Sequence, residues 1–201
     1  PDGYHDLQTL FQMLDWGDEM SFSVTNDGRI SRDCNIDSIP EEQDICVEAA
    51  RRLQAICGVN QGVHIDLIKN IPMGSGLGGG SSDAAAVLRG LNILFGRPLS
   101  RPELCRAGAS LGADVPFFLR QGTWLLKGRG DRFVRKIPSR PLHYLLFCSG
   151  AQSETKPVYA AGSGSSGEPP VSSAGLMRAL GSGNASVIRR NIRNDLCSRF
   201  F

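Results

Sequence analysis

Short segments in which hydrophobic and polar residues alternate recur along the chain, a pattern typical of β-strands with one buried face. Leu7–Leu14 and Met20–Val24 are two such segments, and the turn sequence at 15–18 lies between them. They therefore predict two strands of one sheet joined by a turn. Further strands are predicted at Val63–Ile68, Gly122–Lys127, Arg132–Ile137 and His143–Cys148.

Other segments repeat hydrophobic residues at helical spacing. Helices are predicted at Glu41–Cys57, Ser81–Phe95, Ser100–Gly112, Leu176–Leu180 and Ala185–Ile192. The first places four hydrophobic residues on one face, namely Ile45, Ala49, Leu53 and Ile56. Gly58 follows it and is typical of a helix end, while Ser100 and Glu103 form a capping-box pattern at the start of the third.

This order of elements, hairpins mixed with helices, favours an α+β fold over a strictly alternating parallel one. Pro138 and Pro141 interrupt the pattern, so we place a domain boundary near residue 140. Residues 1–139 then form a first domain with a mixed sheet and helices. Residues 140–201 hold too few elements to complete a second domain, and Gly162–Pro170 predicts a surface loop.

The loop between the Val63–Ile68 strand and the next helix contains five glycines in seven positions. It reads Pro72-Met73-Gly74-Ser75-Gly76-Leu77-Gly78-Gly79-Gly80-Ser81-Ser82. Backbone amides without side chains at the start of a helix favour an anion, because the first-turn N–H groups are unpaired and the helix dipole is positive there. Three serine hydroxyls add further partners for phosphate oxygens. A polyphosphate is therefore the predicted ligand.

Other glycine-rich phosphate motifs fit less well. The glycines satisfy GxGxxG, but a dinucleotide site also needs an acidic residue about 20 positions later, and 94–98 contains none. A P-loop requires Gly-Lys-Ser/Thr after the glycines, whereas Gly79 is followed here by Gly80 and Ser81. The HRD and DFG motifs of protein kinases do not occur in the sequence.

Composition narrows the class of protein further. The chain has 201 residues, 41% hydrophobic and 21% charged, with a net charge of +2, which favours neither a nucleic-acid partner nor a membrane surface. No apolar run approaches the roughly 18 residues of a membrane span. We therefore expect a cytoplasmic protein without a membrane or nucleic-acid partner. The chain begins at Pro1 and ends at Phe201, and we expect that it is cut at both ends.

Three segments together resemble the GHMP kinase superfamily. The glycine loop follows its Pro-x-x-x-Gly-Leu-x-Ser/Gly-Ser/Gly-Ser pattern, and Gly112–Phe118 reads GADVPFF. Asp2–Phe11 contains the DGYH-x-L-x-[ST] pattern of the branch that phosphorylates a cytidine-diphosphate-linked methylerythritol. The resemblance implies a two-domain GHMP kinase architecture in which the C-terminal domain is incomplete.

The resemblance also implies a reaction, in which ATP donates its γ-phosphoryl group to the 2-hydroxyl of the cytidylyl substrate in the non-mevalonate isoprenoid route. The loop, Pro72–Ser82, would bind ATP, and Mg²⁺ would accompany it, although no direct metal ligand is identified. Asp114 matches the family's catalytic aspartate and would act as the general base. From the residues alone, Asp114 could also cap a turn before Pro116.

Four further residues are implied to bind the acceptor. Tyr4 and His5 match the family's cytosine readers, through ring stacking and hydrogen bonding. Thr155 and Tyr159 fit a looser family pattern in which the aromatic ring closes over the base. For Lys69 two interpretations stay open, a position near the adenosine or a solvated strand end.

Two motifs of the family do not occur in this sequence, an upstream Pro-x-Lys-x-Asn segment with a catalytic lysine and a downstream Gly-Thr/Ser-Gly segment. We therefore expect this fragment to be weakly active or inactive, although the complete protein is a kinase. The alternatives are another GHMP kinase acting on a different small alcohol, and a catalytically impaired phosphate-binding fragment.

Overall fold

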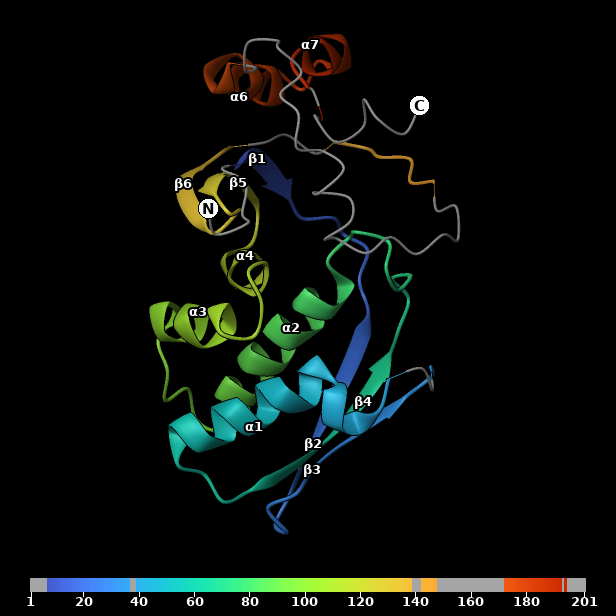
Figure 1. The fold of residues 1–201 in the computed structure, drawn as a ribbon, viewed down its shortest axis with the longest axis vertical. Coiled ribbons are helices and arrows are strands. Elements are labelled where there is room, and N and C mark those ends of the chain that lie inside the picture. Colours follow the sequence, from blue (N-terminus) through green and yellow to red (C-terminus); the bar gives the residue numbers. More distant parts are fainter. Residues whose placement is uncertain (1–6, 37–38, 139–141, 148–171, 193, 195–201) are drawn as a thin grey trace, which may run out of the picture. The chain divides into compact units, whose positions relative to one another are not determined.

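The computed structural model describes residues 7–36, 39–138, 142–147, 172–192 and 194 (Figure 1). The chain packs as two compact units. One is Met13–Gln121, called the loop unit below because it contains the glycine loop. The other combines Pro1–Gln12 with Gly122–Phe201 and is called the second unit.

The loop unit is built on a three-stranded sheet, in the order β2 (Glu19–Thr25), β4 (Gly62–Ile68) and β3 (Ile30–Cys34). β2 runs antiparallel to the central strand β4, and β3 runs parallel to it. Burial alternates along β4: Val63, Ile65 and Leu67 are buried on one face, whereas the residues between them are partly or fully exposed. The predicted strand at 63–68 is confirmed.

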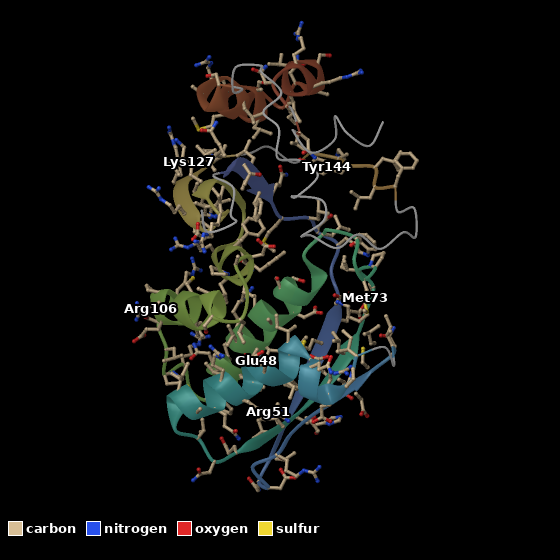
Figure 2. All side chains as sticks on the ribbon, in the orientation of Figure 1. Glu48, Arg51, Met73, Arg106, Lys127 and Tyr144 are labelled. Carbon is tan, nitrogen blue, oxygen red and sulfur yellow. The ribbon has the colours of Figure 1, made fainter. Side chains whose placement is uncertain are left out.

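Two helices pack on the buried face of this sheet, α1 (Ile45–Cys57) and α2 (Gly79–Leu94), and lie side by side (Figure 1). A short 3₁₀ turn, Glu41–Gln43, precedes α1, and the Asp44 carboxylate caps it by accepting from the Cys46 N–H at 2.7 Å. The outer face of α1 carries the exposed Glu48 and Arg51 (Figure 2). Gly58 ends α1 at φ 64°, as predicted.

The predicted hydrophobic face of α1 is only partly correct. Ala49 and Leu53 are fully buried, but Ile56 is 51% exposed. The buried stripe also passes through Cys46 and Ala50, so its centre is about a quarter turn from Ile56.

α2 is followed by α3 (Arg101–Ala109) and by α4 (Val115–Arg120). The capping box at the start of α3 is confirmed, because both the Ser100 N–H and its hydroxyl donate to Glu103 Oε2, at 2.8 and 2.5 Å. α4 was not predicted, since a helix of 6 residues carries too few turns for a periodic pattern.

The second unit contains an antiparallel sheet in the order β1 (Leu7–Gln12), β5 (Thr123–Gly128) and β6 (Arg132–Lys136). Helices α6 (Ser173–Ser182) and α7 (Ala185–Arg190) contribute to its core. That core contains Leu125, Ile137, Ala179, Leu180 and Ile188. The predicted strands at 122–127 and 132–137 and the two late helices are therefore confirmed.

Two predictions about strands are wrong, and one strand was not predicted. Leu7–Leu14 and Met20–Val24 do not form a hairpin, because β1 pairs with β5 and β2 pairs with β4, in two different sheets. β3 was missed because only Ile30 of its five residues is buried. Residues 142–147 form no regular element, and their hydrophobic side chains include Leu145, 80% exposed, and Phe147, 89% exposed.

Other predictions are not decided by this structure. Cys148 and the predicted loop Gly162–Pro170 lie outside the described residues. The two packing units do not coincide with the predicted domains 1–139 and 140–201, because β1 pairs in one sheet with β5 and β6. The division into these two domains stays a prediction. No helix in the described part of the chain is long and apolar enough to cross a membrane.

Candidate active site

The glycine loop connects the end of β4 to the start of α2 by a path that alternates in handedness. Gly74, Gly76 and Gly78 adopt φ values of 68°, 75° and 74°. The Gly78 backbone also lies close to the Phe118 ring, since a Cβ at Gly78 would lie 2.9 Å from Phe118 Cζ. A residue with a side chain would be strained at that position on both counts.

The start of α2 leaves its first backbone amides available. Its N-cap is Gly78, so no side chain caps the helix. The first intrahelical bond of the turn runs from the Ser82 N–H to the Gly78 carbonyl at 2.9 Å. Among the described residues, no acceptor pairs with the amides of Gly79, Gly80 or Ser81. This geometry suits an anion.

The three serines of the loop differ in what their hydroxyls do. Ser82 Oγ donates to the Gly79 carbonyl at 2.7 Å, and Ser75 Oγ accepts from the Leu77 N–H at 3.4 Å. The Ser81 hydroxyl makes no hydrogen bond to another described residue. Of the three, only Ser82 has its O–H donor engaged by a described residue, and Ser75 and Ser81 keep theirs for a ligand.

The segment Gly112–Phe118 lies beside the glycine loop. The Phe118 ring packs against Gly78, and a Cβ on Gly112 would be 3.8 Å from Ser81 Oγ. Two segments that the sequence separates by about 35 residues are thus brought together through α2 and α4.

Asp114 lies in this segment, directly before α4, and its side chain does not cap the helix. Asp114 is half-buried, and its carboxylate forms no hydrogen bond or ion pair with any other residue that the structure describes. Burial raises the pKa of this carboxyl above its ordinary value. The interpretation of Asp114 as a turn cap is therefore wrong, and its catalytic role stays a prediction.

A cavity of about 380 Å³ opens beside the loop. One wall is the glycine loop and the first turn of α2, and another is hydrophobic, formed by Ile36, Ile39, Ile45, Leu67, Ile71 and Met73. Arg32 and Asp44 add a buried ion pair, with Nε 2.8 Å from Oδ2. A concave, mainly apolar site with a few fixed polar groups is the usual form of a small-molecule site.

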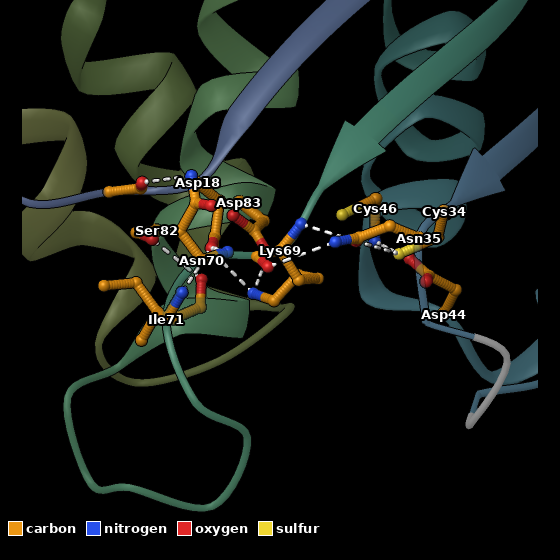
Figure 3. A network of polar contacts seen from close by, with 12 residues as sticks. Asp18, Cys34, Asn35, Asp44, Cys46, Lys69, Asn70, Ile71, Ser82 and Asp83 are labelled. Carbon is orange, nitrogen blue, oxygen red and sulfur yellow. Dashed lines mark hydrogen bonds and ion pairs between the residues drawn. The ribbon is translucent and has the colours of Figure 1, made fainter. Parts of the chain in front are cut away.

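Lys69 follows β4 and also lines the cavity, but its ammonium is engaged by two carboxylates (Figure 3). Nζ donates to Asp83 Oδ2 at 2.6 Å and to Asp18 Oδ2. The Lys69 side chain is only 9% exposed, so the interpretation as a solvated strand end is wrong. Its position near an adenosine stays a prediction.

The pKa values of this group follow from burial and from these hydrogen bonds. Burial raises the pKa of Asp83 to about 6, against the opposing effect of Lys69. Burial also acts to raise the pKa of Asp18, but the hydrogen bonds from Ile71, Lys69 and Asn70 outweigh it and lower that pKa. For Lys69 the two carboxylates outweigh burial and raise the pKa, so the ammonium stays charged.

The sequence analysis missed Asp18 and Asp83. Asp83 precedes Val87 and Leu91 at helical spacing on the buried face of α2, so a buried carboxylate that needs a partner could have been expected. Asp18 carried no comparable signal, because aspartate is common in turns.

Asp33, His64 and Asp66 form a separate group of side chains of the kind that can bind a metal ion, and one nitrogen or oxygen atom from each lies within 4.8 Å of the others. His64 and Asp66 are on the face of β4 opposite Leu67, which lines the cavity. This group is therefore not part of the site at the glycine loop. The predicted acceptor-binding residues Tyr4, His5, Thr155 and Tyr159 lie outside the described residues.

Comparisons with known proteins agree with this geometry. Residues 44–122 match the family model described as "GHMP kinases N terminal domain". A homoserine kinase from Cytophaga hutchinsonii, 21% identical, shares the fold with a TM-score of 0.64 over 90% of this chain and 64% of its own. The chain therefore has the fold of the GHMP kinases, and its glycine loop lies within the segment that matches their N-terminal domain.

Proteins with higher sequence identity indicate the branch of the GHMP kinases to which this chain is most similar. The 4-diphosphocytidyl-2-C-methyl-D-erythritol kinase of Burkholderia ambifaria is 47% identical over 141 residues, 70% of this chain and 48% of that protein. The kinase of the same name from Aromatoleum aromaticum is 38% identical over 100% of this chain and 68% of its own length. A crystal structure of 4-(cytidine 5'-diphospho)-2C-methyl-D-erythritol kinase, 31% identical, gives a TM-score of 0.80 and covers 100% of this chain and 70% of its own.

The chain belongs to the 4-diphosphocytidyl-2-C-methyl-D-erythritol kinase family. It spans about half the length of the first curated relatives that it matches.

Proposed function

We propose that the protein transfers the γ-phosphoryl group of ATP to the 2-hydroxyl of 4-diphosphocytidyl-2-C-methyl-D-erythritol. The observation that carries this proposal is the uncapped start of α2, which lies next to Gly112–Phe118, the segment of the same unit that contains the half-buried Asp114. The names of the relatives supply the acceptor.

The donor site is the glycine loop with the cavity beside it. The amides of Gly79, Gly80 and Ser81 would hold phosphate oxygens, because they are unpaired within the described residues and lie at the positive end of a helix of 16 residues. The hydrophobic wall of the cavity suits the adenine ring. This arrangement supports Pro72–Ser82 as the ATP-binding segment.

Phosphoryl transfer has a loose and highly charged transition state, so the protein acts mainly by positioning both substrates and stabilising charge. The fixed amides of the loop would supply that stabilisation without reorganisation. Asp114 would orient the acceptor hydroxyl and take its proton. Its raised proton affinity and the lack of a competing partner among the described residues suit a general base.

Mg²⁺ is expected to arrive with ATP, since it binds nucleotide phosphates with few protein ligands and several waters. When bound, it would neutralise charge on the phosphates. The Ser81 hydroxyl fits such an ion or one of its waters, because Ser81 lies in the first turn of α2. For the acceptor, we propose Tyr4 and His5 as cytosine readers and Thr155 and Tyr159 on the other side of the base.

The experiment is an ADP-release assay with ATP and Mg²⁺, in which three acceptors are compared: the cytidylyl methylerythritol, mevalonate and homoserine. Turnover with the first alone, with a phosphorylated product seen by ³¹P NMR, supports the proposal. Turnover with another acceptor favours a different GHMP kinase. Calorimetry with a non-hydrolysable ATP analogue is run in parallel, and binding without turnover would identify a catalytically impaired phosphate-binding fragment.

A further inference from the structure

We propose that Asp18, Lys69 and Asp83 form a positioning network that fixes both ends of the glycine loop, and that the Lys69 ammonium does not bind the phosphates. This inference rests on the proposed function, because it assigns a task to residues around the same phosphate site. A lysine that lines a polyphosphate cavity would otherwise be taken for a phosphate ligand.

The first step is the entrance of the loop. The Asp18 carboxylate accepts from the backbone N–H of Asn70 at 2.6 Å and of Ile71 at 2.7 Å, both through Oδ1. Its other oxygen accepts from Lys69. One buried carboxylate thus holds the two residues that lead from β4 into the loop (Figure 3).

The second step is the exit of the loop. Asp83 is in the second turn of α2, is 4% exposed, and accepts from the same ammonium. A Cβ on Gly79 would lie 3.3 Å from Lys69 Nζ and 3.0 Å from Ile71 Cγ2. The ammonium therefore lies directly against the first residue of α2, where the phosphate-binding amides begin.

The third step fixes the backbone of Lys69 itself. Asn35, the residue after β3, accepts from the Lys69 N–H at 2.8 Å and donates to the Lys69 carbonyl at 3.3 Å. The strand end, the loop entrance and the helix start are thus linked through one residue, Lys69.

The charge of the network and the burial of Lys69 then argue against Lys69 as a phosphate ligand. One ammonium is shared by two carboxylates, so the network has no unneutralised positive charge to offer. Its side chain is 9% exposed, and the side chains of Asp18 and Asp83 are 1% and 6% exposed. Two of the three N–H groups of the ammonium donate to buried carboxylates, so a phosphate would have to compete with both of them for Lys69. The attraction for phosphate is left to the helix amides.

The decisive variant is Asp18→Asn, because the Asp18 side chain is 1% exposed and does not line the cavity. An amide can satisfy either the two backbone N–H groups or the ammonium, but not both. Loss of charge-assisted hydrogen bonds at the loop entrance should weaken binding of the ATP analogue about tenfold or more. If Lys69 were a phosphate ligand held back by Asp18, the same variant would free it and tighten binding.

Hydrogen exchange without nucleotide is the second measurement. The positioning role predicts faster exchange of the Asn70 and Ile71 amides in Asp18→Asn and Lys69→Met, with amides of α3 unchanged. Asp66→Asn, an identical charge change on the exposed sheet face, is the matched control and should alter neither measurement. In turnover, KM for ATP should rise while KM for the acceptor stays constant.

If Asp18→Asn fails to fold, Asp18→Glu keeps the charge and displaces the carboxylate, and weaker nucleotide binding is still expected. Unchanged or tighter binding in the folded variant, or unchanged exchange at 70–71, overturns the proposal. If the unaltered chain binds no nucleotide, the proposed function fails, and the exchange measurement alone decides whether the network positions the loop.

Discussion

The ring of Phe118 lies against the backbone of Gly78, so that a Cβ at Gly78 would be 2.9 Å from Phe118 Cζ. Gly78 is the N-cap of α2, and Phe118 belongs to α4, the helix that follows Asp114. This contact joins the phosphate loop to the segment of the predicted base. It depends on a residue without a side chain.

Gly78→Ala should therefore destabilise the protein. At φ 74° a Cβ costs about 1–2 kcal/mol, and displacement of the Phe118 ring adds to that cost. We expect the free energy of unfolding to fall by about 2–3 kcal/mol, measured by urea denaturation. Gly80→Ala is the matched control, because its φ is not positive and the nearest atom would be Ile45 Cγ2 at 3.8 Å. Equal stabilities of the two variants would contradict this account.

Asp114→Asn should separate catalysis from binding. The amide keeps the size of the side chain but cannot take a proton, so kcat should fall by about 10²–10⁴-fold. The affinity for an ATP analogue should stay the same. Stability should not fall, because burial disfavours the charged carboxylate that the variant removes. Kinetics, calorimetry and urea denaturation of the same preparation check the three statements, and a kcat close to that of the unaltered protein would remove Asp114 from the mechanism.

Local features of the fold could be predicted from the sequence. The glycines predict the loop, the helical spacing after Ser81 predicts α2, and the capping box predicts the start of α3, because each depends on residues close together in the chain. Strand partners could not be predicted. The pattern of β1 is the same whether its partner is β2 or β5, and residues Leu10 and Leu125 that face each other are far apart in sequence.

The residues of the site also differ in whether the sequence alone could predict them. The phosphate loop carries its chemistry in one continuous segment, and Asp114 was found only through the resemblance of its surrounding residues to a family. The partners of Lys69 were missed because they come from a turn before β2 and from the early part of a helix pattern. Their contact with Lys69 exists only once the strand and the helix are packed.

The stability of the protein should depend on pH through Asp83, whose pKa is about 6 in the folded protein because of burial, against an ordinary 3.8. Below pH 3.8 the carboxyl is protonated in both states. Between these values the unfolded chain ionises more readily, so this group's contribution to stability falls as pH rises, by about 3 kcal/mol in total. Above pH 6 it changes no further.

Asp83→Asn removes this titration, whereas the lowered pKa of Asp18, which acts in the opposite direction, stays mainly through its hydrogen bonds from Ile71, Lys69 and Asn70. The stability of the unaltered protein minus that of the variant should decrease between about pH 4 and pH 6. Urea denaturation at several pH values measures it. A difference that rises with pH would mean that Lys69 stabilises the Asp83 carboxylate by more than burial disfavours it.

The packing of α2 on the sheet should be the main determinant of stability in the loop unit. Leu88 is fully buried in the core that also contains Leu53 and Ile65, whereas Leu94 at the end of the same helix is 47% exposed. Leu88→Ala removes buried methyl groups and leaves a cavity, so we expect a loss of about 2–5 kcal/mol. Leu94→Ala makes the same chemical change at the surface and should stay within about 0.5 kcal/mol. Urea midpoints at equal m-values measure both, and similar losses would show that α2 is not held by its buried face.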